Sequence, residues 1–161
     1  MARYLTVIFL LIFYGCEMNG EQIIKPHKLN FDDLKFDVVT KNLTNNFLND
    51  NENQQKIHQI IDYWFNNKIK SNGFDGSLEV YVKKIELNEI KKKDYFKFSI
   101  NLEMELNEIN SNLKAKKTYN VSSKEYGEIT GNFSIKDQES LSLNIMHQSI
   151  DSISKKLKEL I

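Results

Sequence analysis

Few residues of this 161-residue chain have the types and spacing that chemistry requires. The three histidines, His27, His58 and His147, stand far apart, and a metal site would need His58 and His147 to meet between packed helices. The six scattered glycines form no phosphate-binding loop, and no nucleophile motif is present. We therefore expect no metal, no cofactor and no enzymatic activity.

Glu103 and Glu105 form the best-placed pair of carboxylates. Both project from the same side of one expected strand, and paired carboxylates can act as acid and base when their environments separate their pKa values. Lys97 and Asn101 share that side, which indicates a hydrated sheet surface and not a catalytic pocket. We interpret Glu103 and Glu105 as candidate contacts to a partner.

Two tyrosines join them as candidates. Tyr81 and Tyr119 lie in expected strands, and aromatic side chains are enriched at protein interfaces. The candidate partner surface therefore consists of four residues: Tyr81, Glu103, Glu105 and Tyr119.

The amino terminus carries the most specific pattern. After the basic residue Arg3, an apolar run extends from Leu5 to Tyr14, which is too short to cross a bilayer, because a spanning helix needs about 20 residues. The run ends at Gly15 and Cys16, the single cysteine of the chain. A basic start followed by a short apolar run predicts a signal peptide and export.

The end of this run resembles a bacterial lipobox, in which a small residue precedes a cysteine that is acylated on sulfur and becomes the new first residue. Gly15 fits this pattern, whereas Phe13 and Tyr14 stand where an aliphatic and a small residue are usual. From this resemblance we predict lipidation at Cys16. Several acyl chains on the cysteine would give stable membrane anchoring. A plain secretory signal with an incidental cysteine and an uncleaved signal anchor remain the alternatives.

These features divide the chain into a signal peptide at residues 1–15, a polar lipidated tether at 16–30 and one domain at 31–161. We expect an exported protein, anchored to a membrane and facing the periplasm. Lysine plus arginine and aspartate plus glutamate both number 22, so the chain lacks the cationic excess on which nucleic-acid binding rests. We expect a protein partner in the cell envelope and no nucleic acid.

Hydrophobic periodicity predicts the secondary structure. Apolar residues at three-and-four spacing indicate amphipathic helices over residues 54–70 and 136–160, with Asn51 or Asn53 capping the first and Ser134 with Asp137 the second. Alternation predicts strands over residues 33–40, 78–87, 96–106, 113–121 and 129–135, with a bulge at residues 83–84. Residues 40–53, rich in Asn, Asp and Thr, read as a long surface loop.

The fold class that follows is α+β: a single antiparallel sheet of about four strands, with both amphipathic helices packed on one face. The opposite face is polar and is left for solvent or a partner.

Several motifs together carry a family resemblance. They are the lipobox, the Asp37-Val38-Val39 strand, the Asp62-Tyr63-Trp64 helix, Gly73, the strands at residues 78–82 and 96–106, and the closing helix. Their order resembles small uncharacterised lipoproteins of alphaproteobacteria. More loosely, the chain is similar to envelope lipoproteins that assist lipid or lipopolysaccharide transport, which also set a small sheet against helices.

Three functions are consistent with these patterns. The leading hypothesis is a non-enzymatic accessory subunit that docks on an envelope complex through a sheet edge or the polar sheet face. The phenylalanine-rich strand at residues 96–106 suggests the alternative, a carrier of a lipid or small apolar ligand between sheet and helices. A surface hydrolase is the weakest of the three.

Overall fold

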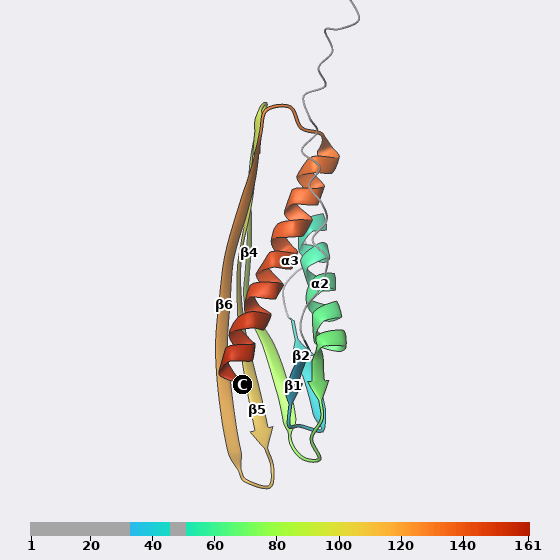
Figure 1. Ribbon diagram of the computed structural model, residues 1–161, viewed down its shortest axis with the longest axis vertical. Helices are drawn as coiled ribbons and strands as arrows, with labels where there is room; N and C mark the ends of the chain where they lie inside the picture. The colour runs from blue at the N-terminus through green and yellow to red at the C-terminus, as the bar shows by residue number, and fades with distance from the viewer. Residues whose placement is uncertain (1–32, 46–50) are drawn as a thin grey trace, which may run out of the picture.

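The computed structural model describes residues 33–45 and 51–161 (Figure 1). The predicted signal peptide, Cys16 and the predicted tether lie outside these residues. Within the two ranges, none of the helices has the length and apolar character needed to cross a membrane. In chain order the elements are β1 (Leu34–Phe36), β2 (Thr40–Thr44), α2 (Glu52–Lys68), β3 (Ile69–Ser71), β4 (Ser77–Lys92), β5 (Tyr95–Asn110), β6 (Ala115–Thr130) and α3 (Ile135–Leu160).

The fold is α+β, as predicted. A four-stranded sheet has the order β2-β4-β5-β6, and both helices lie on one of its faces (Figure 1). The strands β4, β5 and β6 are antiparallel and have 16 residues each, so they are roughly 50 Å long. The short edge strand β2 runs parallel to β4.

The expected strand over residues 33–40 is in fact divided between two sheets. Leu34–Phe36 pairs in parallel with Ile69–Ser71 as a separate two-stranded sheet, and Thr40–Thr44 joins the main sheet beside β4. The prediction of a loop over residues 40–53 was therefore wrong for its first five residues. Their polar composition suits an edge strand with an exposed side, and alternation alone does not identify the partner of a strand.

The strand expected at residues 113–121 continues without a break to Thr130, so β6 also takes in the first two residues of the strand expected at 129–135. The prediction of a separate strand over residues 129–135 was wrong, because residues 131–134 connect β6 to α3, which begins at Ile135. Polar residues on the helix-facing side of β6 concealed the alternation, because Ser123 and Glu125 occupy positions where an apolar residue was expected. Both find partners on the helix side, since the Oγ of Ser152 in α3 donates to Glu125 Oε1 at 2.6 Å and the Oγ of Ser123 donates to the same oxygen at 3.4 Å. Buried polar groups are tolerated where they find such partners.

Several local predictions are confirmed. The register of β4 shifts between Val82 and Lys84, which is the expected bulge. Asn51 caps α2 by accepting a hydrogen bond from the backbone N–H of Gln54 at 2.9 Å. Ser134 and Asp137 form the capping box of α3, and these hydrogen bonds lower the pKa of the Asp137 carboxyl.

Helix α2 ends at Lys68, two residues earlier than expected. The backbone of Ile69 is extended, with φ −84° and ψ 115°, and leads directly into β3. Ile69 is fully buried there, so its apolar character serves the small sheet instead of the helical stripe.

The hydrophobic core fills the layer between the main sheet and the helices. It takes the inward side chains of the strands and the apolar stripes of α2 and α3, as the two periodicities predict. Its largest fully buried members are Trp64, Phe36, Phe98, Leu34, Ile57, Ile61, Ile69, Leu78, Leu102, Met104 and Leu106.

Candidate functional site: the outer face of the sheet

The main sheet has one face that no described helix covers, and we call it the outer face (Figure 1). Side chains reach it from alternate positions of β4, β5 and β6, because successive residues of a strand point to opposite sides. Its central residues are Glu79, Tyr81, Lys83, Lys84, Glu86, Asn101, Glu103, Glu105, Asn107, Thr118, Asn120, Ser122 and Lys124.

Tyr81 and Glu105 are direct cross-strand partners on this face. The Tyr81 hydroxyl donates a hydrogen bond to Glu79 Oε2 at 2.7 Å. Lys83 lies above both, with its Nζ 3.3 Å from Glu105 Oε2 and 5.7 Å from the centroid of the Tyr81 ring. The phenol, the two carboxylates and the ammonium group therefore form one connected cluster.

Hydrogen bonds set the charge state of this cluster. The amide of Asn107 donates to Glu105 Oε1 at 2.8 Å, and this bond and the one from Lys83 lower the pKa of the Glu105 carboxyl. The hydrogen bond to Glu79 raises the pKa of the Tyr81 hydroxyl. Glu105 is thus held as a carboxylate and Tyr81 as a neutral phenol, which suits ion pairing and hydrogen bonding better than proton transfer.

Glu103 lies on the other side of the β4 bulge, between its cross-strand partners Lys84 and Ser122. Lys84 Nζ is 2.9 Å from Glu86 Oε1, and this hydrogen bond is the main cause that raises the pKa of the Lys84 ammonium group. Positive and negative charges alternate across the face, so it has no large field of one sign.

The structure places Tyr119 away from the other three candidate contacts. Tyr119 points toward the helix side of β6 and is only 8% exposed, and its ring meets Phe36 edge-on with the centroids 6.1 Å apart. Its hydroxyl donates to Glu108 Oε2 at 2.8 Å. Tyr81, Glu103 and Glu105 therefore share one surface, and Tyr119 lies on the opposite side of the sheet.

The position of Tyr119 leads to a prediction about stability at high pH. Burial, reinforced by the hydrogen bond to Glu108, raises its pKa to about 12, whereas a tyrosine in the unfolded chain ionises near pH 10. Between these values the folded state binds more protons than the unfolded state, so this contribution to stability is complete below about pH 10 and is lost as the pH rises toward 12. Denaturant unfolding measured between pH 10 and 12 should show that the free energy of unfolding falls more steeply with pH for the wild type than for Tyr119→Phe.

Tyr126 provides the matched control. It lies in the same strand but is 67% exposed. If Tyr126→Phe flattened the pH profile as much as Tyr119→Phe did, the effect could not be assigned to the buried hydroxyl.

Within residues 33–45 and 51–161, His58 and His147 belong to no group that could hold a metal ion. The ring of His58 is hydrogen-bonded through Nδ1 to the Asn45 side chain, and burial lowers the pKa of its imidazole. His27 lies outside the described residues. Among the residues that are described, there is no group of three or more histidine, cysteine, aspartate and glutamate side chains that could hold a metal ion.

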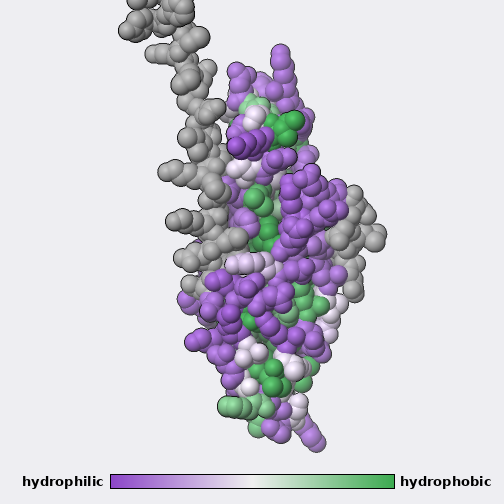
Figure 2. Space-filling model, turned by 90° about the vertical axis from the view of Figure 1, so that its right-hand side faces the viewer, coloured by the Kyte–Doolittle hydropathy of each residue, from purple (hydrophilic) through white to green (hydrophobic). Residues whose placement is uncertain are grey.

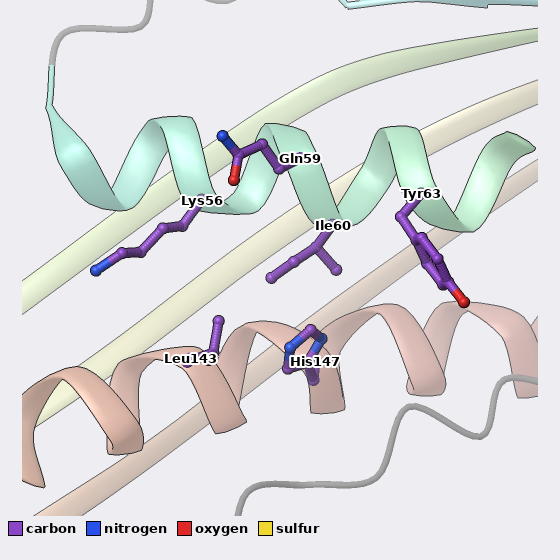
Figure 3. A pocket seen from close by; sticks show the side chains of 6 residues that line it. All are labelled: Lys56, Gln59, Ile60, Tyr63, Leu143 and His147. Carbon is purple, nitrogen blue, oxygen red and sulfur yellow. The ribbon is translucent and has the colours of Figure 1, made fainter.

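His147 instead lines a shallow hollow between α2 and α3 (Figure 3). The hollow has a volume of about 140 Å³, small beside the 300 Å³ or more of typical ligand sites. The residues that line it are Lys56, Gln59, Ile60, Tyr63, Leu143 and His147. The layer beneath, between helices and sheet, contains Trp64, Phe98 and Met104, each no more than 2% exposed. A ligand between sheet and helices would have to displace these buried side chains, and the ligand-carrier alternative stays a hypothesis.

Two residues of the outer face, Asn107 and Thr118, were not predicted from the sequence. Asn107 and Thr118 extend the network from Glu105 into β6, with the Thr118 hydroxyl donating to Asn107 Oδ1 at 2.7 Å. The sequence did contain a sign of Asn107, because it follows Glu103 and Glu105 at the same spacing of two residues. It lies just beyond residue 106, where the strand was expected to end.

Comparison with known proteins finds similarity in solved structures only. No protein-family model matches the chain, and no curated protein matches it. The minor lipoprotein from Acinetobacter baumannii aligns with a TM-score of 0.42 and 8% identity, over 78% of this chain and 90% of that chain. Rare lipoprotein B from Shewanella oneidensis aligns with a TM-score of 0.42 and 9% identity, over 76% and 96% of the two chains.

Proposed function

We propose that this chain is a periplasmic lipoprotein, anchored through Cys16, that acts as a non-enzymatic accessory subunit by binding a protein of an envelope complex through the outer face. The observation that supports the binding role is the outer face itself. It spans the strands of a long sheet without a described helix over it, and it brings Tyr81, Glu103 and Glu105 to one surface.

The network on this face favours a protein partner. Tyr81 and Glu105 are already held by Glu79, Lys83 and Asn107 before any partner binds. Because these side chains are ordered in advance, binding loses less conformational entropy. Alternating charges and an aromatic ring also provide the specific contacts that distinguish one protein surface from another.

The binding role can be tested by crosslinking in intact host cells, followed by purification through a carboxyl-terminal tag and mass spectrometry. We expect one envelope protein to be recovered repeatedly with the wild type and at least tenfold less of it with Glu103→Lys. The matched control is Glu159→Lys, which makes the same charge reversal at an exposed position near the end of α3. Equal loss with both variants, or recovery of no recurrent partner, would contradict the proposal.

The anchor is tested separately with Cys16→Ser. We expect this variant to lack the mass of the acyl chains and to leave the membrane fraction when cells are lysed, since the lipid supplies the membrane affinity. A variant that stays membrane-bound with no change in mass relative to the wild type would show that Cys16 is not lipidated.

A further inference from the structure

Three loops meet at the end of the molecule where β5 turns into β6, which is the lower end in Figure 1. Each carries an exposed apolar side chain, and we call these three residues the apolar tip. Phe74 between β3 and β4 is 100% exposed, Leu113 between β5 and β6 is 76% exposed, and Val39 between β1 and β2 is 56% exposed. Figure 2 shows hydrophobic and hydrophilic side chains side by side at this end.

The loop that carries Phe74 is held in place by its backbone. The N–H of Gly73 donates to Val38 O at 3.1 Å, and the N–H of Val39 donates to Gly76 O at 3.2 Å. A side chain at Gly73 would lie only 2.4 Å from the backbone carbon of Asp37, so the loops at residues 37–39 and 72–76 are in close contact. These backbone contacts hold the loop at residues 72–76 in the position in which the Phe74 side chain is exposed.

The third loop is tied to the same unit. The backbone N–H of Asn112 donates to Asp75 Oδ2 at 2.8 Å, which links the neighbour of Leu113 to the neighbour of Phe74. This bond uses one oxygen of the Asp75 carboxylate, and the Asp37 side chain lies beside Gly73, so two acidic side chains share this end of the molecule with the tip.

Lysines surround the tip on its β6 side. Lys114, Lys116 and Lys117 are all exposed, and none of them forms an ion pair with a residue in the described part of the chain. Protruding apolar side chains flanked by ammonium groups match the boundary of an anionic bilayer, where rings and methyl groups enter the acyl layer and lysines meet the headgroups.

We propose that the apolar tip inserts into the interfacial region of a membrane that contains anionic lipids. A bilayer accepts convex, separated side chains, whereas a protein partner would need a matching pocket for each of them, and this geometry favours the bilayer. The inference does not rest on lipidation of Cys16 or on the outer face. Together with an anchor, such a contact would give the long sheet a defined orientation on a membrane.

The test places a fluorescent reporter in the tip. Phe74→Trp is introduced into the full chain carrying Cys16→Ser, and Trp64, the single native tryptophan, contributes a constant background because it is fully buried. With vesicles of equal parts phosphatidylglycerol and phosphatidylcholine, we expect the emission of the new tryptophan to shift to the blue and to be quenched by brominated acyl chains. Tyr126→Trp, at an exposed site on β6, is the matched control and should show neither effect.

Charge dependence provides the second readout. Replacing Lys114, Lys116 and Lys117 by glutamine in the reporter chain should raise the lipid concentration needed for half of the blue shift about tenfold or more. An unshifted Phe74→Trp emission in the presence of bound vesicles, or an equal shift for Tyr126→Trp, would overturn the proposal. Burial of residue 74 in cells without any response to vesicles would assign the tip to a protein partner and would also overturn it.

Discussion

Trp64→Ala is expected to lower the free energy of unfolding by about 3 to 5 kcal/mol, which is a large part of the stability of a domain of this size. Trp64 is 0% exposed, and its ring extends from α2 into the core, where it reaches Ser154 of α3. Removing its ring leaves a cavity that the surrounding side chains fill only in part, so both the transfer energy and the packing contacts are lost. Denaturant unfolding followed by far-ultraviolet circular dichroism measures the loss without relying on the deleted fluorophore.

A second contribution can be separated from packing. The indole Nε1–H donates to Ser154 Oγ at 2.8 Å, and Ser154 Oγ donates in turn to Ile150 O at 2.9 Å. Trp64→Phe keeps an aromatic ring but loses this bond, and it should cost less than Trp64→Ala. Ser154→Ala leaves the buried indole N–H without its partner, at a cost of about 1 to 3 kcal/mol. If Trp64→Ala were no more destabilising than Ser154→Ala, packing of the ring would not be the dominant effect.

The predictable parts of the fold are those in which one period persists over many residues. The stripe through Ile57, Ile61 and Trp64 identifies α2 because three-and-four spacing can bury a single helical face. The alternation through Phe96, Phe98 and their successors identifies β5 in the same way. Capping was also predictable, since the cap residues satisfy their hydrogen bonds within one turn.

The pairing of the strands could not be predicted from the sequence. Leu34 and Thr40 lie in one alternating segment, but a break at residues 37–39 sends them to different sheets. At this break the backbones of Val38 and Val39 are hydrogen-bonded to Gly73 and Gly76, more than 30 residues away along the chain, and local periodicity does not report such contacts. In β6 the obstacle was different, because Glu125 is half-buried with a partner on α3 that only the folded structure reveals.

The candidate surface could be predicted wherever the alternation of a strand shows which of its side chains point away from the core. Tyr81, Glu103 and Glu105 share the outer face because each alternates with apolar residues that are buried. Tyr119 is in phase with Val121, which is also buried, and its phase therefore placed it on the helix side. Aromatic character was a weaker guide to exposure than position in the alternation.

Gly76→Ala is expected to destabilise the protein by about 2 to 5 kcal/mol, through two separate causes. Gly76 has φ +82°, a conformation that side chains disfavour, and a Cβ there would lie 2.1 Å from the carbonyl oxygen of Ile109. That oxygen belongs to the backbone of β5, so it cannot move aside without disturbing the sheet. Gly76 O also accepts the N–H of Val39 at 3.2 Å, so a shift of Gly76 would weaken the entry into β2 as well.

Gly131 allows the two causes to be separated. Its φ of +87° is nearly the same, but a Cβ there would meet nothing within 4 Å. Gly131→Ala should therefore cost only the conformational part, about 1 kcal/mol. Unfolding of the two variants and the wild type in denaturant gives the difference directly, and that difference measures the clash with Ile109. Equal losses for both variants would mean that β5 yields to the added methyl group, and the close approach of the residue 72–76 loop to this strand would then contribute little to the stability of the fold.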